Sequence, residues 1–140
     1  MIPLSIPNIN GNEWQYVKDC LDTGWISSAG EYVNKFEEAI RNYTGLKYAI
    51  ACMNGTAGLQ VSLSLAGVTN EDIVIAPNLT FVATLNAISY SGAETFLVDV
   101  YDDSWQMDVN LLHKWLENNT ITKYINGKPI TAEISSGKKI

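Results

Sequence analysis

The chain has 140 residues, of which 46% are hydrophobic and 17% are charged, a composition typical of a soluble globular protein with a core. Its formal net charge of -6 disfavours nucleic acid and anionic membranes as partners, because binding either one requires a basic patch. There is no basic leader and no apolar run as long as a membrane span, and the two cysteines lack the spacing of a zinc site, so we expect a cytoplasmic protein.

Two amphipathic helices are predicted in residues 1–45. Asn12 can cap the first helix, which is expected to end near Gly24. The second helix is predicted over Glu31–Tyr43, with Gly45 as its C-terminal stop. The polar loop "GWISSAG" joins the two helices.

Residues 46–118 show three repeats of an apolar strand, a turn and a helix. The strands are predicted at "YAIACM", "IVIAP" and "ETFLVDV", and the helices over Thr56–Gly67, Thr80–Ser91 and Val109–Asn118. This alternation predicts an α/β fold with a mostly parallel sheet flanked by helices. The turns that follow the strands should lie along one edge of this sheet, where open α/β sheets bind ligands.

Residues 119–140 depart from this pattern. Asn126-Gly127 between "TKYI" and "KPIT" predicts a β-hairpin with a type I′ turn. Three parallel strands alone would leave two exposed sheet edges, so we interpret residues 1–140 as the incomplete N-terminal portion of a larger α/β protein.

The first turn of the predicted sheet, "NGTAGL", allows two interpretations. The N–H groups of Gly55, Thr56 and Ala57 could bind a phosphate at the start of a helix, with Gly55 at positive φ. Alternatively, Asn54 could simply cap that helix. The turn matches neither a Walker A loop nor the G-x-G-x-x-G fingerprint, so a nucleotide-binding Rossmann-like domain is disfavoured.

The second turn, "PNLTF", places Phe81 at the start of the next helix. Its ring could belong to the core, or it could stack on a flat heteroaromatic cofactor beside a phosphate site. No metal site is predicted, since the acidic residues over 99–108 lack the glycine and the closing glutamate of a calcium loop.

Taken in order, "GWISSAGEYVNKFEEAIRNYTGLKYAIACMNGTAGLQVSLSLAGV" and "IVIAPNLTFVATLNAISYSGAETFLVDV" resemble the N-terminal part of the DegT/DnrJ/EryC1/StrS sugar aminotransferases. The resemblance covers about residues 3–118 and implies the large domain of a fold type I, pyridoxal-phosphate-dependent aminotransferase. It implies that Gly55, Thr56 and Ala57 hold the cofactor phosphate and that Phe81 stacks on the pyridine ring. It also implies that Trp25 and Ser27 approach a nucleotide-sugar substrate.

The resemblance further implies an amino-acid amino donor, a homodimer in the full-length protein, and amino-sugar synthesis for bacillosamine- or legionaminic-type glycans. The resemblance implies that the Schiff-base lysine of such enzymes lies downstream of this region, and none of the eight lysines here is assigned to that role. We therefore expect the 140 residues to lack a catalytic lysine and to be inactive alone. The alternative is a non-catalytic binding or assembly module that keeps only the phosphate-binding half of the site.

Overall fold

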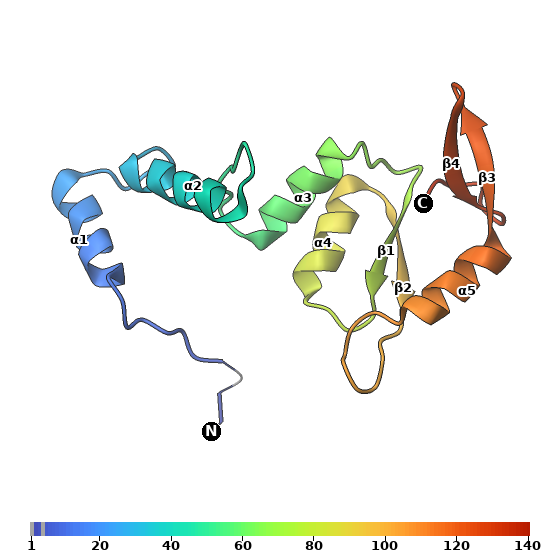
Figure 1. Ribbon diagram of the computed structural model, residues 1–140, viewed down its shortest axis with the longest axis horizontal. Helices are drawn as coiled ribbons and strands as arrows, with labels where there is room; N and C mark the ends of the chain where they lie inside the picture. Colours follow the sequence, from blue (N-terminus) through green and yellow to red (C-terminus); the bar gives the residue numbers. More distant parts are fainter. Residues whose placement is uncertain (1, 4) are drawn as a thin grey trace. The chain divides into compact units, whose positions relative to one another are not determined.

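The computed structural model describes residues 2–3 and 5–140, and Figure 1 shows the order of its helices and strands. The chain divides into two compact units, residues 1–51 and residues 52–140, and each is described by itself. Among the described residues, no helix combines the length and the apolar character needed to cross a membrane.

The first unit contains the two predicted helices, α1 (Glu13–Thr23) and α2 (Glu31–Thr44). Gly24 and Gly45 end them in the left-handed conformation, with φ of 76° and 72°. The predicted side-chain cap at Asn12 is wrong: its φ of -96° and ψ of 13° are not the extended values of a capping residue, and its side chain makes no cap hydrogen bond. Neither helix buries a residue completely, so their apolar stripes remain at the surface.

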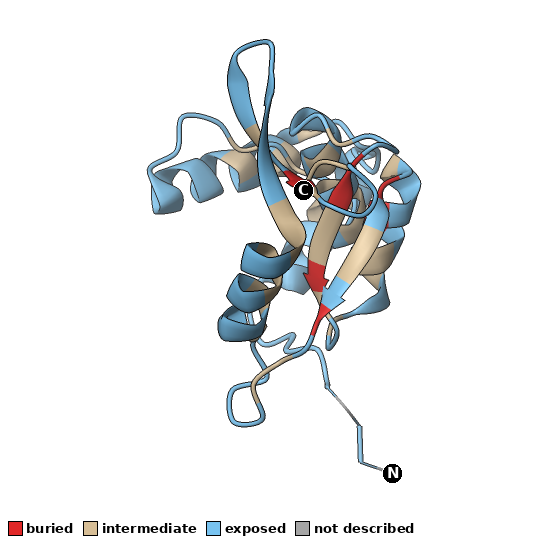
Figure 2. Cartoon of the chain, turned by 90° about the vertical axis from the view of Figure 1, so that its right-hand side faces the viewer, coloured by how far each residue is buried: buried red, intermediate tan, exposed pale blue. Residues whose placement is uncertain are grey.

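The second unit is built on a two-stranded parallel sheet. Strands β1 (Ile73–Pro77) and β2 (Glu94–Val98) pair from Ile73↔Glu94 to Pro77↔Val98. Helices α3 (Gly55–Leu65) and α4 (Val82–Ser91) pack against each other, α4 contacts both strands, and α5 (Val109–Asn119) follows β2. The small core consists of Ala76, Ile88 and Ala93, with Leu63, Val68, Val74 and Leu85 packed around it. Figure 2 shows buried segments on the strands of the parallel sheet, whereas most of the rest of the chain is intermediate or exposed.

The prediction of a strand at "YAIACM" is wrong for this structure, because residues 48–53 form no regular secondary structure. A strand gains its backbone hydrogen bonds from a neighbouring strand, and no strand of the described residues pairs with this segment. Tyr48 and Met53 are accordingly exposed, although their sequence is that of a buried strand.

The predicted hairpin is confirmed. Strands β3 (Thr120–Ile125) and β4 (Lys128–Glu133) are antiparallel, with Ile125 paired to Lys128 across the two-residue turn. Asn126 and Gly127 both have positive φ, 51° and 75°, as a type I′ turn requires. Beyond the hairpin, Lys139 forms an antiparallel bridge to Ala132.

A buried carboxylate connects the hairpin region to the parallel sheet. Asp72 is only 5% exposed and directly precedes β1. One of its oxygens accepts hydrogen bonds from the Thr69 backbone N–H (2.7 Å) and hydroxyl (3.1 Å), and the other pairs with Lys139 Nζ at 3.1 Å. The backbones of Asp72 and Lys139 also form a parallel bridge, in which the Ile73 N–H donates to the Lys139 carbonyl at 2.7 Å. The last residues therefore lie beside the amino end of β1.

The pKa of Asp72 yields a stability prediction. Burial acts to raise this pKa, but the hydrogen bonds from Thr69 and the ion pair with Lys139 outweigh it and hold the pKa below its ordinary value of 3.8. A lowered pKa in the folded state stabilises the protein above the unfolded-state pKa, and this stabilisation is lost as the pH falls through the folded-state value. The wild-type free energy of unfolding should therefore decrease below about pH 4.

We expect Asp72→Asn to lose about 1–3 kcal/mol of unfolding free energy at pH 7 and to show a smaller loss on acidification than the wild type. Urea denaturation at pH 7 and pH 3 measures both effects. Asp102→Asn, which changes an exposed carboxylate, is the control. Equal acid sensitivity of Asp72→Asn and the wild type would contradict the prediction.

Candidate functional site

The start of α3 is held by a side-chain cap. The Asn54 backbone is extended, with φ of -161° and ψ of 172°, and its Oδ1 accepts a hydrogen bond from the Ala57 N–H at 2.9 Å. Its carbonyl accepts from the Gly58 N–H at 3.1 Å. The cap therefore engages the Ala57 amide in this structure, and the predicted contribution of Ala57 to a phosphate site stays a prediction.

The other two amides of this turn remain available. Within the described part of the chain, the N–H groups of Gly55 and Thr56 donate to no protein acceptor. Thr56 is half-buried and brings a hydroxyl to the same place. Because the unpaired N–H groups of a first helical turn carry partial positive charge, these two amides and this hydroxyl form a site suited to an anion.

Gly55 is unusual among the ten glycines. Its φ is not positive, contrary to expectation, and a Cβ built on it would meet no atom within 4 Å. Neither the backbone conformation nor steric crowding within the protein thus requires a glycine at this position. A glycine here leaves open space directly over the free amides, and a ligand could fill that space.

Phe81 is the N-cap residue of α4 and is 78% exposed, so it is not a core residue in this structure. Its carbonyl accepts from the Thr84 N–H at 3.0 Å, and the neighbouring hydroxyls of Thr80 and Thr84 lie 3.0 Å apart. In Figure 1, α3 and α4 both begin at the end of the second unit where β1 and β2 finish. The free amides and the exposed ring thus belong to the same edge of this unit.

Trp25 and Ser27 lie in the first unit, in the loop between α1 and α2. Trp25 is 63% exposed, and the Ser27 hydroxyl contacts only the backbone of Ala29, at 3.4 Å. Both residues line a groove of about 820 Å³ together with Tyr16, Cys20, Tyr32 and Phe36. The aromatic lining of this groove was not expected from the sequence, where the same positions indicate only a helix packing face.

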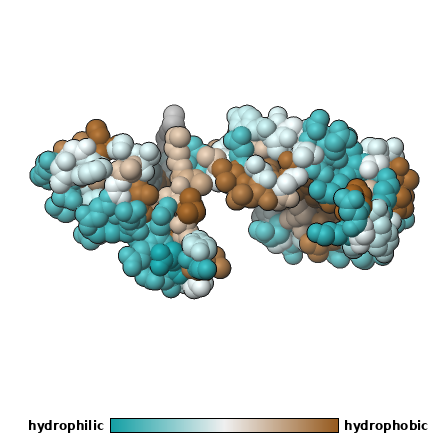
Figure 3. Space-filling model, turned by 90° about the horizontal axis from the view of Figure 1, so that it is seen from above, coloured by the Kyte–Doolittle hydropathy of each residue, from teal (hydrophilic) through white to brown (hydrophobic). Residues whose placement is uncertain are grey.

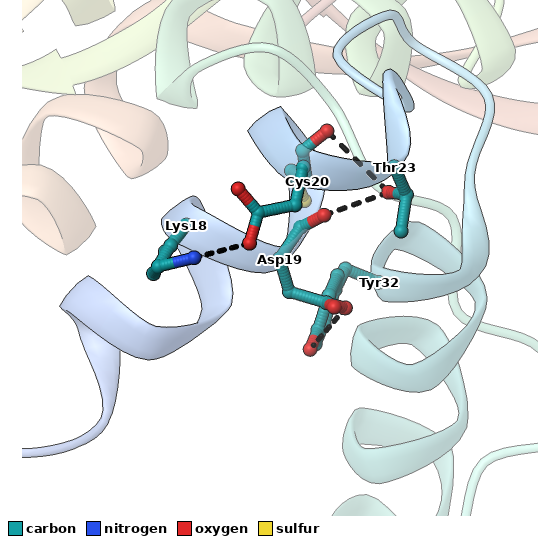
Figure 4. A network of polar contacts seen from close by, with 6 residues as sticks. Lys18, Asp19, Cys20, Thr23 and Tyr32 are labelled. Atoms are coloured by element: carbon teal, nitrogen blue, oxygen red, sulfur yellow. Dashed lines mark hydrogen bonds and ion pairs between the residues drawn. The ribbon is translucent and has the colours of Figure 1, made fainter.

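A polar network borders this groove. The Tyr32 hydroxyl donates to Asp19 Oδ2 at 3.1 Å, and the Thr23 hydroxyl donates to the Asp19 carbonyl at 2.7 Å (Figure 4). Partial burial raises the pKa of Tyr32, and the hydrogen bond to Asp19 raises it further. The Tyr32 hydroxyl therefore stays protonated and acts as a donor.

The ion-paired lysines of the second unit lie away from the free amides. Lys138 pairs with Glu94 at 3.0 Å and Lys139 with Asp72, at the amino ends of β2 and β1. That is the edge opposite to the start of α3 and α4. In the first unit, Lys18 pairs with Asp22 and Lys35 with Glu31. Among the described residues, no group of histidine, cysteine and acidic side chains is arranged to hold a metal ion.

Comparison with known proteins gives a consistent result. Residues 7–130 match the model of the DegT/DnrJ/EryC1/StrS aminotransferase family. The chain is 40% identical over 119 residues to GDP-perosamine synthase of Escherichia coli O157:H7, covering 85% of this chain and 33% of that protein. It is also 40% identical over 119 residues to GDP-perosamine synthase of Caulobacter vibrioides, covering 85% of this chain and 32% of that protein.

Solved structures agree with these matches. A Streptococcus pneumoniae protein assigned as a sugar aminotransferase, solved in its PLP form, superposes with a TM-score of 0.71 at 33% identity, covering 81% of this chain and 29% of that one. The fold class is thus confirmed as that of fold type I PLP aminotransferases. The chain spans about a third of the length of the curated relatives that it matches.

The cap at Asn54 is directly testable. Asn54→Ala should lower the free energy of unfolding by about 1 kcal/mol, because the Ala57 N–H loses its acceptor. Asn54→Asp keeps the acceptor oxygen and should retain the stability. Urea denaturation of the two variants beside the wild type measures the difference, and equal stability of Asn54→Ala and Asn54→Asp would show that the side chain does not cap α3.

Proposed function

Because the chain belongs to the DegT/DnrJ/EryC1/StrS aminotransferase family, we propose that it forms the phosphate-binding part of a pyridoxal 5′-phosphate site in an enzyme that aminates a keto group of a nucleotide-linked sugar. The observation that carries this proposal is the pair of unengaged amides at Gly55 and Thr56, with open space where a Cβ would stand. The names of the relatives, which include GDP-perosamine synthases, support the substrate class.

The residues of this chain have separate tasks in the proposed site. The N–H groups of Gly55 and Thr56 and the Thr56 hydroxyl donate hydrogen bonds to the phosphate, and the N-terminal end of α3 adds a favourable potential. Ala57 contributes through its bond to Asn54, which fixes the turn. Phe81 offers its exposed ring as a stacking surface for the pyridine. When bound, the cofactor supplies the electron sink that amino transfer requires.

The loop between α1 and α2 in the first unit would contact the substrate. The exposed indole of Trp25 and the hydroxyl of Ser27 offer a stacking surface and a hydrogen-bonding group, which suit the sugar and base of a nucleotide sugar. An amino acid would serve as the amino donor, and the full-length protein would act as a cytoplasmic homodimer. We further propose that the product enters bacillosamine- or legionaminic-type glycans, on the basis of the spacing and the hairpin of this chain.

The 140 residues are proposed to bind the phosphate without catalysing amino transfer. Four of the eight lysines are already paired with carboxylates of this chain, two of them at the opposite edge of the sheet. The alternative is a non-catalytic binding or assembly module, which would also bind phosphate without catalysing amino transfer. Exposed apolar residues such as Trp14 on α1 and Tyr43 on α2 are consistent with such a module.

Two matched glycine variants test the phosphate site. Gly55→Ala places a methyl group in the open space over the amides and should weaken PLP binding at least about ten-fold, since a hydrogen bond to a charged group contributes about 1.5–3 kcal/mol. Gly58→Ala, in the same helical turn, gains only an ordinary contact of 3.9 Å to Cys52 and should bind like the wild type. Titration calorimetry with PLP measures both affinities.

Pyridoxal without its phosphate is the ligand control and should bind weakly to all three proteins. Unfolding curves should show that neither substitution destabilises the chain, since alanine is preferred over glycine within helices. Equal affinity of Gly55→Ala and Gly58→Ala for PLP would refute the assignment of the phosphate to this turn.

The absence of a catalytic lysine has its own test. The chain is incubated with PLP, reduced with borohydride and analysed by mass spectrometry after digestion. We expect no stoichiometric pyridoxyl adduct at a single lysine and no turnover of a nucleotide-linked keto-sugar with glutamate. A single fully modified lysine together with turnover would overturn this part of the proposal and leave the phosphate site intact.

A further inference from the structure

The position of Phe81 depends on the first turn of α4 rather than on the core. Exposed apolar side chains are widespread on this chain, as the brown atoms in Figure 3 show, so exposure alone does not distinguish this ring. The buried residues of α4 are Ala87 and Ile88, which lie in its second half. Phe81 and Val82 at its start are 78% and 58% exposed, so core packing does not fix them. The local hydrogen bonds of this turn must therefore set the backbone that carries the ring.

Phe81 is also an unusual residue for the N-cap of a helix. Preferred N-cap residues carry a side-chain oxygen that accepts an N–H of the first turn, and a phenyl ring has none. The start of α4 accordingly has no side-chain cap hydrogen bond, although the Phe81 backbone is extended, with φ of -72° and ψ of 141°, as in a capping residue. The chain thus forgoes a side-chain cap and carries an aromatic ring at this position.

Thr84 makes the bonds that hold the backbone on both sides of this ring. Its N–H donates to the Phe81 carbonyl at 3.0 Å. Its hydroxyl oxygen lies 3.0 Å from that of Thr80, and this hydrogen bond joins the residue directly before Phe81 to the first turn of the helix. Both threonines are half-buried. One residue, Thr84, is therefore bonded to Phe81 itself and to the residue that precedes it.

The sheet fixes the other end of the short loop that leads to Phe81. Asn78 directly follows β1, and its N–H donates at 2.7 Å to the carbonyl of Val98, the last residue of β2. Only two residues separate Asn78 from Phe81. The loop is thus held by the sheet at its start and by Thr84 at its end. Of these two attachments, only the second includes a side chain, so it can be altered by substitution.

We propose that Thr84 is a positioning residue of the cofactor site, whose hydrogen bond to Thr80 fixes the ring of Phe81 as the stacking surface for the pyridine of pyridoxal 5′-phosphate. This inference rests on the proposed function, in which the phosphate binds at Gly55 and Thr56. Thr84 acts through Phe81 and not by touching the cofactor. Because stacking depends on the offset and angle of the two rings, loosening the Phe81 backbone lowers the affinity for the pyridine and leaves the phosphate contacts unchanged.

Pyridoxamine 5′-phosphate is the probe for the test, because its amine cannot form a Schiff base with a lysine. Titration calorimetry measures its affinity, and its induced circular dichroism at saturation reports how firmly the bound pyridine is held. Thr84→Val keeps the shape of the side chain without the hydroxyl. It should weaken binding about two- to ten-fold, the range that stacking energies imply, and should at least halve the induced signal per bound ligand. The affinity for inorganic phosphate, which has no ring, should equal that of the wild type.

Three further variants separate positioning from a general loss of structure. Thr84→Ser retains the hydroxyl and should restore both the affinity and the induced signal. Thr80→Val removes the other partner of the same hydrogen bond and should reproduce the result of Thr84→Val. Thr122→Val, the same substitution at an exposed threonine of β3, should bind like the wild type. Urea denaturation verifies that each variant is folded.

A double-mutant cycle tests whether Thr84 acts through Phe81. Phe81→Ala should weaken binding of pyridoxamine 5′-phosphate at least as much as Thr84→Val, and adding Thr84→Val to Phe81→Ala should cause no further loss. Additive losses, an equal loss of affinity for inorganic phosphate, or wild-type affinity and induced signal in Thr84→Val would each overturn this inference and leave the phosphate site at Gly55 intact. A wild-type chain that does not bind pyridoxamine 5′-phosphate would instead overturn the proposed function, and this inference with it.

Discussion

The carboxylate of Asp72 joins the turn at Thr69 and the start of β1 to Lys139, which is remote in the sequence. The backbone carbonyl of Asp72 also accepts a hydrogen bond from the Glu94 N–H at 3.0 Å, at the start of β2. A buried charge is costly unless it is paired and hydrogen-bonded, and each of these partners offsets part of that cost. The arrangement fixes the amino edge of the sheet, and so orients the opposite edge, where α3 and α4 begin.

The two edges of the parallel sheet carry different polar groups, because all strands begin at one edge and end at the other. Ion pairs of Lys138 and Lys139 close the amino edge, so its cations are committed to structure. At the carboxyl edge, helix starts leave N–H groups that their own helices cannot satisfy, and the exposed ring of Phe81 lies at the same edge. A phosphate ester with an aromatic ring matches this combination, because it needs donors at one end and a flat apolar surface at the other.

Several features set by neighbouring residues, though not the Asn12 cap or the φ of Gly55, could be predicted from the sequence, whereas features set by distant residues could not. Gly45 as a helix stop and Asn126-Gly127 as a turn depend on local backbone conformation, and the structure confirms both. The strand expected at residues 48–53 depends on a pairing partner, and its apolar sequence alone does not provide one. The role of Asp72 was missed for a related reason: its charge partner, Lys139, is near in space and remote in sequence.

At the candidate site, residue types could be predicted but their hydrogen bonding could not. The sequence "NGTAGL" allowed either a helix cap or a phosphate-binding turn. The structure shows that Asn54 caps the helix and that its side chain engages only the Ala57 amide. The remaining question is why Gly55 is a glycine. Six other glycines have positive φ, which explains them through the backbone, and Gly55 has neither that constraint nor a neighbour within 4 Å. Gly58 in the same helix also lacks a positive φ and meets only an ordinary contact at 3.9 Å, so Gly55 is distinguished by its open space and its unengaged amide. This space is the basis on which we propose that a ligand approaches the amides of Gly55 and Thr56 closely.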